Sequence, residues 1–228
     1  MVKSPRSLAS IVENQVHRWE ARRPTGAPAS VGHRPVITVS REYGARGALV
    51  AQRVAERLGF EVWDKALVHE IAKDSQTTAR VVETLDEHRR NTFADVLSNF
   101  MRGKSLTSAD YLARLARTVH TIAGHGAAVI VGRGAQHLLG DHDALVVRVV
   151  APLADRIAGI MERRRLDKKA AAHEMKSVED DRSGFVKQTY GVDIADPTNY
   201  DIVVNLGRLS IDQAADAIAA VYRARFGG

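Results

Sequence analysis

The sequence contains no cysteine and few aromatic residues. Among its 228 residues Cys is absent, and Phe, Trp and Tyr together make up 5%. Without cysteine the chain can form no disulfide, thiolate nucleophile or cysteine-based zinc site. Its nine histidines show no HExxH or similar ligand spacing, and no Gly-x-Ser-x-Gly elbow is present. Thiol chemistry is therefore excluded, and no metal-ligating residues are predicted.

Long apolar runs are missing too. The longest, near residues 127–131 and 144–150, are too short to cross a bilayer. The N-terminus lacks the apolar segment of a signal peptide. The sequence therefore predicts a cytoplasmic protein with no membrane span, for which a cysteine-free composition is suitable.

The positive charge is concentrated near the N-terminus. The formal net charge is +6, but residues 1–35 contain six Lys/Arg and two Asp/Glu, so the other 193 residues carry only +2. A basic leader can bind a phosphate backbone, although short basic termini are commonly solvated arms. Because aromatic residues for base stacking are scarce, we expect no nucleic-acid partner.

Residues 1–22 are predicted to hold an amphipathic helix. Apolar residues recur at helical spacing from Ser7 to Trp19. Two prolines and two glycines follow, which makes residues 23–34 a predicted linker before one domain at 35–228. The helix could dock on its own domain, on a second copy or on a membrane. Its weakly cationic polar face favours self-docking or a homodimer.

Five short apolar segments, rich in β-branched residues, are typical of buried strands. They span residues 36–40, 60–63, 128–131, 145–150 and 201–205. Helical patterns alternate with them at 49–58, 67–74, 107–123, 152–165 and 210–223. Continuous apolar strands separated by helices predict a three-layer, doubly wound α/β domain with a parallel sheet.

Two segments are longer than ordinary crossovers. Residues 65–125 form a mostly helical insertion, and residues 163–197 form a charged helical excursion before the last strand. Insertions at the carboxyl ends of strands commonly build substrate pockets and lids in α/β enzymes. We therefore expect an acceptor-binding insertion and a lid.

The segment from Ser40 to Ala48 resembles a phosphate-binding loop without its lysine. Gly44 and Gly47 could present backbone N–H groups to an anion at the start of the next helix. In the motif GxxxxGK[ST], Gly47 stands where lysine would fall. Arg41 and Arg46 flank the turn, and their guanidinium groups could replace part of the missing charge.

Two further strand ends carry polar residues. Asp64 and Lys65 follow the second strand, and Asp64 could either order Mg²⁺ or a substrate hydroxyl, or cap the helix that follows. Arg133 stands between Gly132 and Gly134 after the third strand, where it could contact a phosphate or a base.

The densest basic run begins at Arg163. Most of its members are expected to be solvated, but arginines on a mobile segment can stabilise a transferring phosphoryl group. If the protein is a kinase, one or two arginines of this region have that role. The candidates are Arg156, Arg163, Arg164 and Arg182.

Four blocks in order, within about residues 36–222, resemble the cytidylate kinase-like proteins, a divergent branch of the nucleoside monophosphate kinases in the P-loop superfamily. The blocks are residues 37–44 with the helix that follows, 63–65, 129–134, and 179–182 leading to 200–205. The resemblance implies a five-stranded parallel sheet of order 2-3-1-4-5, with a monophosphate-binding insertion and a lid.

The resemblance also implies roles for individual residues. Residues that hold the phosphates of the donor, ATP with Mg²⁺, would be Ser40, Arg41, Gly44, Ala45, Arg46, Gly47 and Ala48. The acceptor would contact Arg133 and Arg182, with Asp64 a further candidate from its strand-end position. Arg46 and the lid residues Arg163 and Arg164 are the predicted catalytic residues.

Two functions remain open from the sequence. The first is an ATP-dependent phosphotransferase that acts on a nucleotide or another small acceptor, by positioning and charge neutralisation. The second is a catalytically inactive regulator that binds a nucleotide or phosphate. The missing loop lysine and hydroxyl motivate the second, since both would stabilise charge that grows in the transition state.

Overall fold

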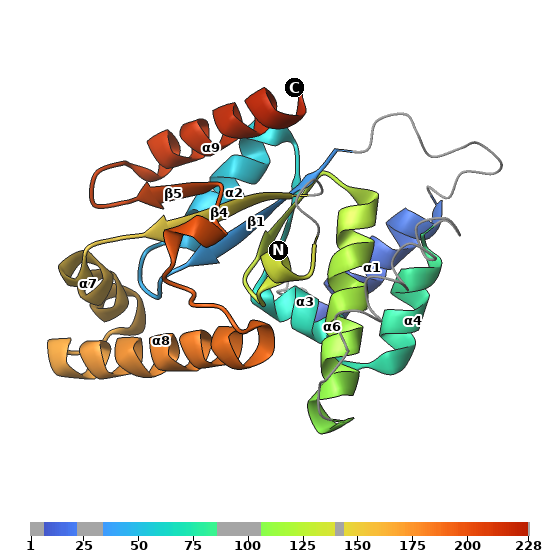
Figure 1. The fold of residues 1–228 in the computed structure, drawn as a ribbon, viewed down its shortest axis with the longest axis horizontal. Coiled ribbons are helices and arrows are strands. Elements are labelled where there is room, and N and C mark those ends of the chain that lie inside the picture. The colour runs from blue at the N-terminus through green and yellow to red at the C-terminus, as the bar shows by residue number, and fades with distance from the viewer. Residues whose placement is uncertain (1–6, 22–33, 86–105, 140–143, 228) are drawn as a thin grey trace, which may run out of the picture.

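Five parallel strands form one sheet in the computed structural model, which describes residues 7–21, 34–85, 106–139 and 144–227 (Figure 1). The sheet order is β2-β3-β1-β4-β5, as the family resemblance implied. The strands are β1 (Val36–Arg41), β2 (Glu61–Trp63), β3 (Ala128–Val131), β4 (Ala144–Val150) and β5 (Ile202–Asn205). Each lies within one residue of the apolar segment that predicted it, so the predicted doubly wound α/β fold is confirmed.

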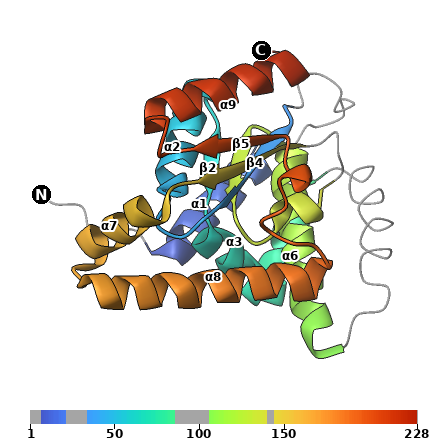
Figure 2. The same ribbon diagram turned by 60° about the vertical axis from the view of Figure 1, so that its left-hand side comes forward.

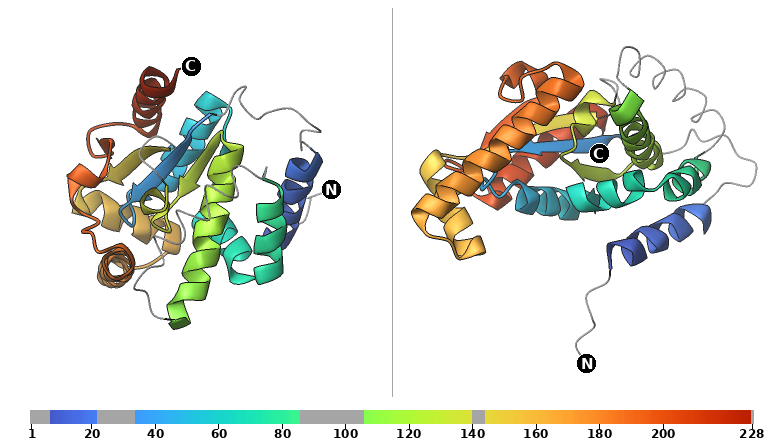
Figure 3. Two further views of the ribbon diagram at one scale, coloured as in Figure 1. Left: turned by 45° about the vertical axis from the view of Figure 1, so that its right-hand side comes forward. Right: turned by 90° about the horizontal axis from the view of Figure 1, so that it is seen from below.

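Helices cover both faces of the sheet (Figures 1 and 3). On one face α2 (Gly47–Leu58) packs against α9 (Ile211–Phe226). On the other, α6 (Leu106–His125) packs against α3 (Lys65–Lys73) and α4 (Ser75–Glu83). Ile37 and Val39 of β1 belong to the core under α2 and α9, whereas Val36 belongs to the opposite core. The alternation of side chains along a strand thus produces the three predicted layers.

The N-terminal helix α1 (Leu8–Ala21) docks on its own domain. Its buried residues include Val12, Val16 and Trp19, and the Trp19 ring stacks on Trp63 with centroids 5.2 Å apart. The Gln15 amide donates a hydrogen bond of 2.7 Å to Glu61 of β2. Self-docking, one of the predicted alternatives, is therefore what the structure shows. The predicted linker at 23–34 lies outside the described residues except for Arg34.

The two long excursions are mainly helical. Residues 65–125 contain α3, α4 and α6, although 86–105 fall outside the described part of the chain. The charged excursion contains the end of α7 (Leu153–Arg164), the 23-residue α8 (Lys168–Tyr190) and the short 3-10 helix η2 (Pro197–Asn199). Figure 2 shows α8 running beneath the sheet, next to α7. No helix among the described residues is long and apolar enough to span a membrane.

Candidate functional site

The loop between β1 and α2 lies closely against α7. Gly44 has φ +87°, and a Cβ atom there would stand 2.6 Å from the Arg156 carbonyl oxygen, so only glycine fits. Arg46 also has a left-handed backbone, with φ 58°, immediately before α2. The N–H groups of Gly47 and Ala48 open the first turn of this helix, where they have no intrahelical acceptor. The loop therefore has the backbone of an anion-binding turn.

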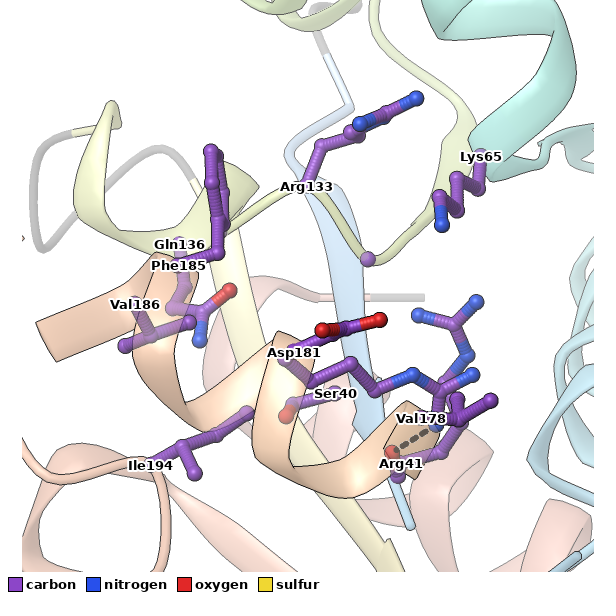
Figure 4. A pocket seen from close by; sticks show the side chains of 13 residues that line it. Ser40, Arg41, Lys65, Arg133, Gln136, Val178, Asp181, Phe185, Val186 and Ile194 are labelled. Atoms are coloured by element: carbon purple, nitrogen blue, oxygen red, sulfur yellow. Dashed lines mark hydrogen bonds between the residues drawn. The ribbon is translucent and has the colours of Figure 1, made fainter. Parts of the chain in front are cut away.

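A cavity of about 300 Å³ lies beside this loop, at the carboxyl ends of β1 and β3 (Figure 4). Four cationic residues from four elements line it. Arg41 ends β1, Lys65 begins α3, Arg133 follows β3 and Arg182 lies on α8. Figure 4 shows Arg133 and Lys65 on one side of the space and Asp181 on another. The carboxyl ends of parallel strands meet at one edge of the sheet, which is why residues far apart in the chain converge here.

Burial, followed by repulsion from nearby cations, lowers the pKa values of three of these residues. Burial, together with the charge of Arg182, lowers the pKa of Arg41 to about 10, which still leaves it charged at neutral pH. Burial and then the neighbouring Arg133, Arg182 and Arg41 lower the pKa of Lys65. The pKa of Arg182 is lowered as well, chiefly by burial. A bound anion would relieve both the repulsion and the loss of hydration.

One residue that lines the cavity has a buried hydrogen-bond donor without a partner in the described part of the chain. The buried Nε of Arg133 has no hydrogen-bond partner among the described residues. Arg133 has φ 57°, and a Cβ on the neighbouring Gly132 would collide with the Arg41 guanidinium, 2.2 Å away. The Gly132–Gly134 turn thus leaves room for Arg41 and holds Arg133 in a strained backbone conformation. Strain and unsatisfied donors of this kind are common at ligand sites.

Helix α8 is held on the loop by charged contacts. The Tyr43 N–H donates a 2.6 Å hydrogen bond to the Glu179 carboxylate. Arg156 of α7 donates to the Tyr43 carbonyl at 2.9 Å and pairs with Glu42 at 3.1 Å and with Glu179 at 3.5 Å. Arg182 donates to the Arg41 carbonyl at 3.1 Å. Helix α8, part of the segment predicted to be a lid, therefore lies against the loop in this structure.

The other predicted residues lie outside the cavity. Arg46 is exposed, and its Nε lies near Gly159 of α7. The Arg163 guanidinium lies 5.8 Å from the centre of the Tyr43 ring, and Arg164 pairs with Glu174 of α8 at 3.2 Å. Asp64 accepts hydrogen bonds from the N–H groups of residues 66 and 67, so it caps α3, the second of its two predicted uses.

Sequence reasoning placed Lys65 at a strand end facing the expected pocket but gave it no role, and it did not single out Asp181 or Arg148. Lys65 was visible beside Asp64 at a strand end, and Asp181 lies next to Arg182 on the lid. Arg148, at 5% exposure, is buried in the middle of the apolar strand β4, where its Nη1 donates to Ser40 Oγ at 2.9 Å. The sequence signal for Arg148 was that it is the one charged residue within the apolar segment 144–150.

The residues of the site fit phosphate groups better than a protein-held metal ion. No cluster of three His, Asp or Glu side chains suited to a metal occurs in the described ranges. Asp181 is a carboxylate that lines the cavity, whereas the Glu42 carboxylate is engaged by Arg156 and by the Ala151 N–H at 3.0 Å. Mg²⁺ that accompanies a nucleotide is held mainly by phosphate oxygens and water, and one carboxylate is enough to assist it.

The sheet order, the glycine-containing loop before α2 and the basic cavity define the class as a P-loop kinase-like α/β fold. Within that class the chain belongs to the cytidylate kinase-like family, whose profile matches residues 36–208. The matched range includes the loop, the residues that line the cavity and helix α8. The family assignment made from the four sequence blocks is therefore confirmed.

Two solved structures are similar to this chain, and the first of them has the same fold. An uncharacterized protein from Eubacterium ventriosum ATCC 27560 is 25% identical, with a TM-score of 0.59, and the match covers 84% of this chain and 100% of that one. An unliganded sugar kinase from Janibacter sp. HTCC2649 is 14% identical at a TM-score of 0.46, covering 86% of this chain and 97% of that one, a likeness too low to inform function. No curated protein matches the chain.

Proposed function

We propose that the protein is an ATP-dependent phosphotransferase that transfers the γ-phosphoryl group to a small acceptor carrying a phosphate group, such as a nucleoside monophosphate. The observation that carries this proposal is the cavity beside the loop, where Arg41, Lys65, Arg133 and Arg182 converge. Four cations in a space of about 300 Å³ suit a phosphorylated small molecule. Membership of the cytidylate kinase-like family supports the reaction class.

The loop and the cavity have different roles in this proposal. The loop from Ser40 to Ala48 would hold the donor's phosphates with backbone N–H groups, and the cavity would hold the acceptor. Mg²⁺, when bound with ATP, neutralises phosphate charge. Catalysis then depends on positioning and on fixed positive charge, with no general base of unusual pKa required.

Three exposed arginines at or near the loop, at positions 46, 163 and 164, are the proposed catalytic residues. Arg163 lies over the Tyr43 ring, and Arg46 lies near α7 at Gly159. Arg46 belongs to the loop, Arg163 lies beside it, and Arg164 follows on the last turn of α7. We keep the hypothesis that these residues reach the transferring phosphoryl group when a donor is bound.

The test measures ADP release with ATP, Mg²⁺ and a panel of nucleoside monophosphates. Replacing Arg133 by Ala removes a charge-assisted contact to the acceptor, so we expect the KM for the acceptor to rise about 10- to 100-fold. Arg53→Ala is the control, because Arg53 lies on the surface of α2 and pairs with Glu56 at 2.8 Å. An unchanged KM in Arg133→Ala would remove Arg133 from the acceptor site.

A second function, the inactive nucleotide- or phosphate-binding regulator, is favoured by one observation. The Glu179 carboxylate bonds to the Tyr43 N–H, so a protein anion is already bound at the loop. Calorimetry together with the ADP assay separates the two functions. ATP binding without ADP release, for any acceptor in the panel, would support the regulator and contradict the phosphotransferase.

A further inference from the structure

Arg148 is a buried cation whose recorded partners are neutral. It stands in the middle of β4, opposite Ser40 of β1 in the sheet register, and is 5% exposed. Its Nη1 donates to Ser40 Oγ at 2.9 Å, and its guanidinium lies 5.6 Å from the centre of the Tyr200 ring. Within the part of the chain that the structure describes, no carboxylate pairs with it.

Burying the charge of Arg148 in this way is unfavourable for the protein without a ligand. Removing a guanidinium from water costs several kcal/mol when no opposite charge compensates it. A hydroxyl and an aromatic face compensate part of this cost. Val146 and Val150, which share this face of β4 with Arg148, are apolar and partly buried, so the face is compatible with an apolar side chain at position 148. The charge therefore calls for an explanation other than stability.

Ser40 connects Arg148 to the cavity, because it is one of the cavity's lining residues. Its Oγ accepts the hydrogen bond from Arg148. The Tyr200 hydroxyl has one hydrogen, which the Ile194 carbonyl accepts at 2.8 Å, and the Tyr200 to Ser40 distance is a long 3.4 Å. The Ser40 hydrogen thus has no good acceptor among the described residues, and a ligand oxygen in the cavity would supply one.

We propose that Arg148 is a positioning residue for anion binding. It holds the Ser40 hydroxyl as a donor to the phosphate group of the ligand, and the charge of that ligand compensates the buried guanidinium. The inference rests on the proposed function, in which the cavity binds a phosphate group. It adds a fifth cation, placed behind the cavity wall, to the four that line it.

Removing the charge of Arg148 should have opposite effects on the stability of the free protein and on its affinity for phosphate. Arg148→Met keeps the length of the side chain and removes the charge, so the free protein should be as stable as wild type or more so. Phosphate binding should be weaker, because the Ser40 donor is no longer held and a positive charge is lost. A purely structural arginine would instead lower the stability of the free protein.

The experiment records thermal unfolding in sodium pyrophosphate and in sodium chloride of equal ionic strength. We expect pyrophosphate to raise the Tm of the wild type. In Arg148→Met the chloride Tm should not fall, and the pyrophosphate-induced rise should shrink to less than half. Ser40→Ala should lose a similar share of the rise, and Arg148→Lys, which keeps the charge, should retain more of it than Met does. Arg53→Met is the control and should keep the full rise.

Three other outcomes would contradict the proposed role of Arg148. A full pyrophosphate-induced rise in Arg148→Met would overturn the inference and leave the phosphate cavity standing. A chloride Tm clearly below that of the wild type would show that Arg148 is structural, which also overturns the inference. A wild type that shows no rise would overturn the phosphate cavity, and the role of Arg148 with it. The ADP-release assay tests the transfer reaction separately.

Discussion

Two exposed arginines, Arg46 and Arg165, have left-handed backbones. Arg46 precedes α2 with φ 58°, and Arg165 follows α7 with φ 55°. An L-residue in this region costs about 1–2 kcal/mol relative to its right-handed conformation. Glycine adopts it freely, although it loses more backbone entropy on folding. Both arginines have this strain, so only the position of Arg46 in the loop before α2 makes it a candidate for a role that glycine could not fill.

Replacing Arg46 by Gly should raise the stability of the fold and, if Arg46 is catalytic, lower the rate of phosphoryl transfer. We expect the free energy of unfolding to rise by about 0.5–1 kcal/mol, the relief of strain less the entropy of glycine. If Arg46 is catalytic, phosphoryl transfer should fall at least tenfold in the same variant. Urea unfolding and the ADP-release assay measure the two effects.

Arg165→Gly is the matched control for this substitution. It relieves the same strain at an exposed helix end, so it should stabilise the fold by a similar amount and leave transfer unchanged. If Arg46→Gly transferred phosphate as fast as Arg165→Gly, Arg46 would have no catalytic role.

At the scale of elements, charged contacts hold the middle of α8, whereas Phe185 and Tyr190 near its C-terminal end pack against the hydrophobic core. Of its 23 residues the buried ones are Ala171 and Val186. Glu179 binds the Tyr43 N–H at 2.6 Å and pairs with Arg156 at 3.5 Å and with Arg182 at 3.4 Å. The part of α8 around Glu179 therefore buries little apolar area and depends on charged contacts for its position.

Glu179→Gln should loosen α8. The variant keeps an oxygen that can accept from the Tyr43 N–H but loses the charge that attracts Arg156 and Arg182. We expect amide hydrogen exchange in residues 168–190 to become several-fold faster. Affinity for pyrophosphate should increase, because a competing carboxylate charge is removed from beside Arg182.

The control for this change is Asp180→Asn. Asp180 is the next residue of α8, is solvent-exposed, and pairs with Lys176 of the same helix at 2.7 Å. Such an exposed pair contributes little. Equal exchange rates for α8 in Glu179→Gln and Asp180→Asn would show that Glu179 does not hold the lid.

On the scale of the whole molecule, one sheet separates two hydrophobic cores and belongs to both. Ile37 and Val129 face the core under α2 and α9, and their neighbours Val36 and Ala128 face the core under α3 and α6. Loss of either helical layer would expose the same strands to water. Each core thus depends on the other, which favours cooperative unfolding.

We expect the two cores to unfold in one transition. Trp19 and Trp63 both lie in the core that contains α1 and α6, so tryptophan fluorescence reports on that side alone. Far-UV circular dichroism reports on all helices. The two signals should give the same midpoint in urea. A fluorescence midpoint at clearly lower urea would mean that the α1 layer separates before the rest of the fold.

Much of the fold was predictable because its signals are local. Uninterrupted apolar segments such as Ala128–Val131 predict buried strands wherever they lie in the chain. The alternation of strands and helices then leaves parallel pairing as the simple solution. The strand order came from the family resemblance, since no local pattern distinguishes the neighbours of β1.

The site was predictable only in part. Ser40, Arg41, Arg133 and Arg182 were chosen at strand ends or from the resemblance, and all four line the cavity. Arg46, Arg163 and Arg164 were chosen for their charge, but the direction of an exposed side chain depends on what surrounds it. Arg148 was not chosen, because a sequence pattern does not show which strands lie beside a buried arginine.

The sequence by itself determined the strands, the helices between them, the α/β class and the position of a glycine-containing loop without lysine, because each depends on residues close together in the chain. Only the tertiary structure decided which cations meet. Arg41, Lys65, Arg133 and Arg182 come from four separate parts of the chain, and the parallel strand ends together with α8 bring them to one cavity. Charge interaction depends on distance in space and on burial, and neither quantity can be read along a chain.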